Sequence, residues 1–135
     1  MSEYDYDANC LVVTPEIPVV DLFAAQNWLQ EILEFKTAWV WEDSFAAMQC
    51  GEVQLYLRKS DKPIVSVRCY LHVKDAQPLY DLCIQRGAVI VDEMESKPWG
   101  AREFAVQSPD GHIFRIGHGE KRVDEISRFT LGKLD

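Results

Sequence analysis

The feature that most restricts the fold of this chain is an internal repeat. The segment Ile17-Pro18-Val19-Val20-Asp21 is followed by an apolar stretch with helical spacing, and so is Leu71-His72-Val73-Lys74-Asp75, which begins 54 residues later. A strand that leads into an aspartate-capped helix explains both copies, because an aspartate carboxylate accepts hydrogen bonds from the free amides of a first helical turn. The repeat therefore predicts two copies of one structural unit.

Each copy continues in the same way after its opening strand. Apolar residues at helical spacing predict the two helices, and Gly87 is a suitable left-handed end for the second one. Three short stretches with strand character follow each helix, namely 36–41, 45–50 and 53–58 in the first copy and 89–94, 102–107 and 112–117 in the second. The turn residues of Ser108-Pro109-Asp110-Gly111 predict that the last two strands form a hairpin. The predicted unit is thus βαβββ, present twice.

These elements define the expected domain organisation. A single domain is expected over residues 11–119, with module one at 11–58, a polar linker at 59–63 and module two at 64–119. Residues 1–10 form an acidic N-terminal arm. Residues 120–135 form a tail that is predicted to be helical, because Val123, Ile126 and Phe129 have helix-like spacing.

Composition excludes several classes of protein. The net charge of −8 disfavours nucleic-acid partners, because phosphate backbones carry the same sign. No apolar run approaches the roughly 20 residues that span a bilayer, so no membrane partner is expected. The acidic start differs from a signal peptide, and a cytoplasmic location is predicted. The cysteines, at positions 10, 50, 69 and 83, lie far apart and form no CxxC pair, which is typical of reduced thiols rather than of disulfides or a zinc site.

Strand side chains alternate between two faces, so parity predicts which residues pack under the helices. The predicted core rows are Val65, Val67, Cys69, Leu71 and Val73; Val53, Leu55 and Leu57; Phe114 and Ile116; and Val13, Ile17 and Val19. The opposite rows hold Arg68, Tyr70 and His72; Glu52, Gln54 and Tyr56; Arg115; and Thr14 and Glu16. Such a polar and aromatic face is either solvated or curled around a cavity.

Two histidines near the hairpin turn raise the question of a metal site. His112 and His118 are six residues apart on one predicted strand, which places them about 20 Å apart. They cannot bind one ion together. Both are predicted to be surface histidines near the ends of the strand.

The two βαβββ copies, the capping aspartates, and the run from Pro98 to Val106 that leads into Ser108-Pro109-Asp110-Gly111 resemble the glyoxalase/bleomycin resistance/dioxygenase superfamily, also called vicinal oxygen chelate proteins. The resemblance implies an α+β fold in which two tandem βαβββ modules form a curled sheet around a cavity, with helices on the outside. It also implies a homodimer, because cups in this family often combine modules from two chains.

Metal-binding members of the family hold a divalent ion with His, Gln or Glu on the opening and closing strands. By resemblance, the matching positions here are Thr14, Gln54, Arg68 and Arg115. Only the Gln54 amide could donate to a metal, and two permanent guanidinium charges would repel it. We therefore predict no metal and no other cofactor.

The remaining similarity is to bleomycin-resistance proteins, which sequester a planar drug between aromatic side chains. This favours a metal-free small-molecule-binding protein over an enzyme, with a flat aromatic ligand in an aromatic and arginine-lined cup. The predicted ligand-binding residues are Trp39, Trp41, Gln54, Tyr56, Arg68, Tyr70, Trp99 and Arg115. No catalytic residue is assigned.

Three alternatives stay open at this stage. The chain could be a metal-dependent lyase or isomerase of the glyoxalase type, or a metal-free enzyme that uses Glu16, Glu52 or His72 as acid or base. It could also be an interaction module whose cup is closed, because Glu16, Glu52 and Glu103 could pair with the arginines and fill it. If the arginines are free, they suit a carboxylate or phosphate on the ligand.

Overall fold

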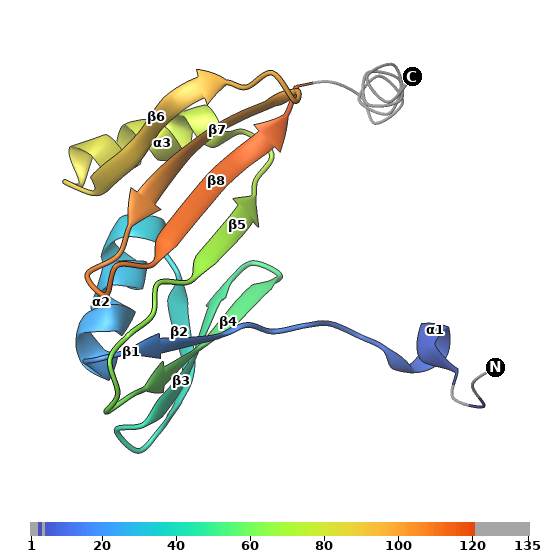
Figure 1. The fold of residues 1–135 in the computed structure, drawn as a ribbon, viewed down its shortest axis with the longest axis vertical. Helices are drawn as coiled ribbons and strands as arrows, with labels where there is room; N and C mark the ends of the chain where they lie inside the picture. Colours follow the sequence, from blue (N-terminus) through green and yellow to red (C-terminus); the bar gives the residue numbers. More distant parts are fainter. Residues whose placement is uncertain (1–2, 4, 121–135) are drawn as a thin grey trace.

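The computed structural model describes residue 3 and residues 5–120, and it confirms the repeated βαβββ unit (Figure 1). A short helix, α1 (Tyr6–Asn9), precedes the first module. Module one consists of β1 (Glu16–Val19), α2 (Leu22–Leu33), β2 (Lys36–Trp41), β3 (Phe45–Cys50) and β4 (Val53–Lys59). Module two consists of β5 (Arg68–His72), α3 (Ala76–Gln85), β6 (Val89–Ser96), β7 (Ala101–Gln107) and β8 (Ile113–Gly119). The predicted C-terminal helix, with Val123, Ile126 and Phe129, lies outside the described residues.

Each module forms its own open four-stranded sheet, which confirms the α+β class. The strand orders are β1-β4-β3-β2 and β5-β8-β7-β6, so the two modules share one topology. The opening strand of each module pairs in parallel with the last one, and the other neighbours are antiparallel. Helices α2 and α3 lie on the left in Figure 1, and the N-terminal arm projects to the right. No helix in the described part of the chain could cross a membrane.

The capping residues confirm the predicted helix boundaries. Asp21 accepts a hydrogen bond from the Ala24 amide at 3.0 Å, and Asp75 accepts one from the Gln77 amide at 3.2 Å. Gly87, with a φ of +77°, follows the end of α3 in the left-handed conformation that glycine adopts without strain. The two aspartates therefore mark where the helices begin, and Gly87 marks where α3 ends, whereas α2 ends with Glu34 as its C-cap.

The predicted core rows are buried in part: Val53 in β4 is 39% exposed, and Cys69 and Leu71 in β5 are only half-buried. Ile17, Val19, Leu55 and Leu57 pack under α2, and Phe114 and Ile116 are buried on β8. The prediction is wrong at the start of both opening strands, which begin later than expected. Val13 is 91% exposed and Val65 is 78% exposed, because Val13 precedes β1 and Val65 precedes β5, so neither is held in a sheet.

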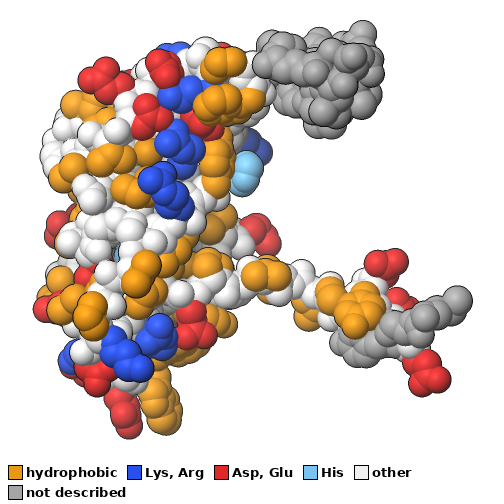
Figure 2. Space-filling model, viewed as in Figure 1, with side chains coloured by type: hydrophobic (Ala, Val, Ile, Leu, Met, Phe, Trp, Pro, Cys, Tyr) orange, Lys and Arg blue, Asp and Glu red, His pale blue; other side chains and the backbone are white. Residues whose placement is uncertain are grey.

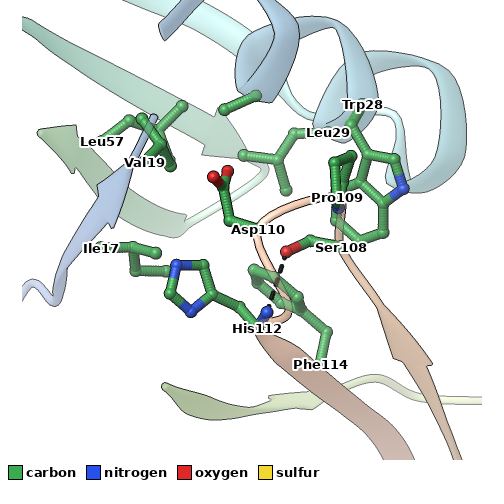
Figure 3. A pocket seen from close by; sticks show the side chains of 11 residues that line it. Ile17, Val19, Trp28, Leu29, Leu57, Ser108, Pro109, Asp110, His112 and Phe114 are labelled. Atoms are coloured by element: carbon green, nitrogen blue, oxygen red, sulfur yellow. Dashed lines mark hydrogen bonds between the residues drawn. The ribbon is translucent and has the colours of Figure 1, made fainter. Parts of the chain in front are cut away.

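The turn between β7 and β8 joins the two modules. It packs against β1 and α2 of module one, where Trp28 contacts Phe114 with ring centroids 5.5 Å apart (Figure 3). The Asp110 carboxylate accepts a hydrogen bond from the Val20 amide at 3.0 Å. The turn that closes a hairpin in one module therefore also docks onto the other module.

His112 lies at the centre of this joint, and its prediction as a surface residue is wrong. The ring is 1% exposed. Its Nδ1 accepts a hydrogen bond from the Val67 amide at 2.9 Å, and its Nε2 lies 2.6 Å from the Pro18 carbonyl oxygen. Because Nδ1 accepts, Nε2 carries the proton and donates a hydrogen bond to the Pro18 carbonyl oxygen. A neutral imidazole therefore links β1 of module one to the segment that enters β5.

His118 is also not a free surface residue. It is half-buried, and its Nδ1 accepts a hydrogen bond from the Ala76 amide at 2.9 Å, at the first residue of α3. The ring thus supplements the Asp75 cap. Sequence parity did not reveal either contact, since both depend on segments that are far away along the chain.

Substitution of His112 by alanine should destabilise the fold by about 2–4 kcal/mol, because each buried group left without a partner costs roughly 1–3 kcal/mol. Urea unfolding followed by circular dichroism measures the change. His72→Ala is the control, since His72 is exposed and its side chain forms no hydrogen bond with the described residues. Equal stability of the two variants would contradict the role assigned to His112.

Candidate functional site

The face of the first sheet opposite α2 carries a cluster of aromatic rings, which we call the aromatic face. Trp39 on β2, Phe45 on β3 and Tyr56 on β4 contact one another, with centroids 5.1–5.8 Å apart. Trp41, two residues beyond Trp39, lies on the same face and is 64% exposed. The alternation of side chains along β2 places both tryptophans on this face, as the sequence predicted.

A small residue beneath the rings allows this arrangement. Ala47 lies between Trp39 and Tyr56 in the sheet register and is fully buried. Since alanine has only a methyl group there, the flanking rings can lean across it. Trp39 is still 45% exposed, so a flat aromatic surface faces solvent. Aromatic faces of this kind bind planar ligands by stacking.

The corresponding face of the second sheet is polar, and we call it the charged face. Its side chains form three rows across strands β5, β8, β7 and β6, as the strand register shows. The rows are Arg68, Ile113, Gln107 and Val89; Tyr70, Arg115, Ala105 and Asp92; and His72, Gly117, Glu103 and Glu95. The two modules therefore present different chemistry on equivalent faces.

Arg115 is the centre of an ionic network on the charged face. Its Nη1 donates to the Asp92 carboxylate at 2.6 Å and lies 3.5 Å from a carboxylate oxygen of Glu103, which is 2% exposed. Lys97 also contacts Asp92 at 3.0 Å. The hydrogen bond from Arg115, with the contribution of Lys97, holds the pKa of Asp92 below its usual range. Arginine and carboxylates thus neutralise each other in the middle of this face.

The Tyr70 side chain reaches across the charged face so that its hydroxyl lies above Gly117. Its hydroxyl donates to the Glu103 carboxylate at 2.5 Å, and its ring lies 4.4 Å from that of His72. A Cβ added at Gly117 would lie 2.5 Å from the Tyr70 oxygen, so only glycine permits this position. Burial, with a further contribution from the Glu103 carboxylate, raises the pKa of Tyr70 to about 12.

The structure groups the predicted site residues into separate sets. Trp39, Trp41 and Tyr56 lie on the aromatic face, and Arg68, Tyr70 and Arg115 lie on the charged face. Within residues 5–120, no hydrogen bond, ion pair or ring contact joins the two sets. Trp99 is exposed in the turn between β6 and β7 and belongs to neither.

Gln54 and Tyr70 share a groove, although they belong to different modules. The groove has a volume of about 270 Å³ and runs between the N-terminal arm, the start of β4 and strand β5. Cys69 and Leu71 also line it, so the apolar row of β5 is covered only in part. This groove is where the two modules approach each other on the side of the arm.

The fold and a comparison with protein families identify the chain. The family model described as Glyoxalase/Bleomycin resistance protein/Dioxygenase superfamily matches residues 11–116. The chain belongs to this superfamily. A search of curated protein sequences gives no match.

Several solved structures of superfamily type share the fold. TioX from Micromonospora sp. ML1 has a TM-score of 0.71 and 20% identity, over 78% of this chain and 97% of that chain. The bleomycin resistance determinant encoded on transposon Tn5 has a TM-score of 0.71 and 22% identity, over 82% and 98%. A bleomycin-binding protein complexed with bleomycin has a TM-score of 0.70 and 22% identity, over 81% and 98%.

The residues at the superfamily's metal positions do not suit a divalent cation. Arg68 and Arg115 lie in adjacent rows of the charged face, Gln54 is on the other sheet, and Thr14 precedes β1. Guanidinium groups donate and cannot ligate a metal. Among the described residues, no group of three or more His, Cys, Asp or Glu side chains could hold an ion. The donor set thus disagrees with the metal chemistry of the superfamily.

Two important residues of the charged face were not assigned to the site from the sequence. Asp92 was overlooked because it faces Arg115 only through a register shift in β6, between Ile90 and Asp92, that parity cannot predict. Glu103 was considered only as a possible partner for the arginines, and it does approach Arg115. Glu16, another of those acids, pairs instead with Arg58 at 3.3 Å.

The raised pKa of Tyr70 predicts how stability depends on pH. The folded phenol keeps its proton up to about pH 12, whereas the unfolded one releases it near its ordinary value of 10. The stabilisation is therefore complete below pH 10 and is lost as the pH rises toward 12. Urea unfolding between about pH 9 and 12 should show a stability advantage of wild type over Tyr70→Phe that shrinks with pH. A constant difference would contradict the Tyr70–Glu103 contact.

Proposed function

We propose that this protein is a metal-free small-molecule-binding protein that holds a flat aromatic ligand against the aromatic face. The observation that carries the proposal is the cluster of Trp39, Phe45 and Tyr56, with Trp39 and Trp41 left exposed. Exposed tryptophans that converge on one surface are costly to leave in water and are enriched at binding sites. The described residues do not bury these tryptophans, since Trp39 is 45% exposed and Trp41 is 64% exposed.

The superfamily supports a binding role of this kind. One protein with the same fold is described as a bleomycin-binding protein complexed with bleomycin, and another as a bleomycin resistance determinant. In this chain two of the four metal positions, Arg68 and Arg115, carry arginine, so binding without a metal is favoured over the lyase or isomerase chemistry of other members. Of the remaining acid and base candidates, Glu16 pairs with Arg58 and His72 packs on Tyr70, and Glu52 is exposed in the turn between β3 and β4.

We further propose that the complete cup forms between two copies of the chain. The aromatic and charged faces make no contact within the described single chain, so another surface has to cover the exposed tryptophans.

The N-terminal arm also points to a partner copy. Leu11, Val12 and Val13 are 90%, 80% and 91% exposed, and Figure 2 shows apolar side chains along this projecting arm. Such a run of exposed apolar residues is typical of an interface. The charged face of one copy, including Arg115, would then face the tryptophans of the other, with Trp99 at the rim.

Removal of the Trp39 indole should weaken binding of the flat neutral probe naphthalene-2-carboxamide by about thirtyfold, the effect typical of a tryptophan at the centre of a binding site. Isothermal titration calorimetry on wild type and Trp39→Ala measures this change. Phe23→Ala is the matched control, since Phe23 is an exposed aromatic residue on α2. An equal loss in both variants, or no loss in Trp39→Ala, would contradict the proposed site.

The exposed apolar residues of the arm predict a homodimer, which acidic substitutions in the arm should disrupt. Sedimentation velocity should show a particle of two 15.5 kDa chains for wild type. The double substitution Val12→Asp and Val13→Asp should give a monomer with an unchanged circular dichroism spectrum, because buried carboxylates without partners oppose association. Val65→Asp, at an exposed position away from the arm, should stay dimeric. A monomeric wild type would overturn the proposal.

A further inference from the structure

We propose that Arg68 binds the carboxylate of the ligand, and that the ligand is therefore a flat aromatic acid rather than a cation. In the proposed dimer, the ring of the acid would lie between Tyr70, next to Arg68 on β5, and the aromatic face of the second copy. The inference rests on the proposed function, since it assigns the chemical class of the molecule that the site takes. It is carried by the distribution of charge and by the position of Tyr70 on the charged face.

Arg68 differs from the other described arginines because its side chain has neither an ion-pair nor a hydrogen-bond partner. Arg58 and Arg86 pair with acids, Arg102 donates to Ser96 and Gln77, and Arg115 pairs with Asp92 and Glu103. Among the described residues, Arg68 forms no ion pair and no hydrogen bond through its side chain. In a chain of net charge −8, an arginine whose side chain has no partner of any kind is notable.

The surroundings of Arg68 explain why its charge stays available. Its row across the sheet continues with Ile113, Gln107 and Val89, none of which is acidic. The acids of this face lie in the other rows, where Arg115 and Lys97 already contact Asp92. An incoming carboxylate would therefore meet one free guanidinium and no carboxylate in the same row. The fork of an arginine matches a carboxylate through two parallel hydrogen bonds.

Tyr70 provides a platform at a suitable distance from Arg68. Its ring lies across Gly117, with its hydroxyl held by Glu103, and it is 39% exposed. Alternate residues on a strand are about 7 Å apart and point to the same side. A ring stacked on Tyr70 could thus place an attached carboxylate at the Arg68 guanidinium. A cationic group in the same place would face repulsion from Arg68 at every accessible pH.

Three naphthalene probes of one shape and different charge test this inference. Isothermal titration calorimetry compares naphthalene-2-carboxylate, naphthalene-2-carboxamide and 2-naphthylmethylammonium on the full chain. Wild type should bind the carboxylate about ten- to hundredfold more tightly than the amide, the range expected for hydrogen bonds to a charged group. The ammonium compound should bind most weakly. Amide shifts of β5 in nitrogen-15 spectra should follow the titration.

Variants of Arg68 test whether the preference for the acid over the amide comes from that residue. Arg68→Ala should bind acid and amide equally, with the affinity for the amide changed less than about twofold, and Arg68→Lys should keep part of the preference because lysine lacks the planar fork. Lys74→Ala is the charge-matched control, because it removes one positive charge from an exposed position near the end of β5. This control should keep the full preference for the acid.

The outcomes separate the two proposals. Equal binding of acid and amide to wild type, with a loss in Trp39→Ala, would overturn the role of Arg68 and leave the proposed function standing. A preference for the acid that depends on Arg68 but not on Trp39 would support the carboxylate site and overturn the aromatic face as the binding surface. A preference that persists in Arg68→Ala would overturn the inference. Failure of all three probes to bind would overturn both.

Discussion

The hydrogen bonds of one buried histidine ring hold the two modules in their relative positions. His112 accepts from the Val67 amide and donates to the Pro18 carbonyl, so a single side chain of module two binds both the first strand and the segment that leads into β5. The contact between Trp28 and Phe114 adds apolar burial beside it. With this joint in place, the helices of both modules lie on one side of the sheets, and the aromatic and charged faces are turned away from them. The groove that Gln54 and Tyr70 share depends on that arrangement.

The two faces use the same structural device with different chemistry. A small residue lies in the middle of each face, Ala47 in the first sheet and Ala105 in the second, and both are fully buried. Over Ala47 the neighbours are aromatic rings that contact each other. Over Ala105 they are Arg115 and Asp92, which meet in an ion pair. The repeated backbone is thus preserved, while the side chains of one copy favour stacking and those of the other favour electrostatic contacts.

The ionic network of the charged face affects whether this chain can bind a metal ion there. The ionic network of Asp92, Arg115 and Glu103 satisfies its charges internally, so the middle of the charged face has little capacity left for an external ion. Burial of Glu103 without partners would be strongly unfavourable, and Tyr70 and Arg115 supply them. Loss of the metal positions and formation of this network are therefore mutually consistent. The positive charge without a partner on this face is that of Arg68, at the start of β5.

The sequence by itself determined the repeated βαβββ unit, the ends of the helices and the sorting of residues between core and polar faces. These features follow from local rules: alternation along strands, helical spacing, and the capping preferences of Asp21, Asp75 and Gly87. The tertiary structure alone decided that His112 is a buried link, that Asp92 meets Arg115 and that Tyr70 lies over Gly117. Such contacts join residues between 23 and 94 positions apart, and they depend on register shifts and module docking. Those are products of the packing of the whole chain, which no local pattern encodes.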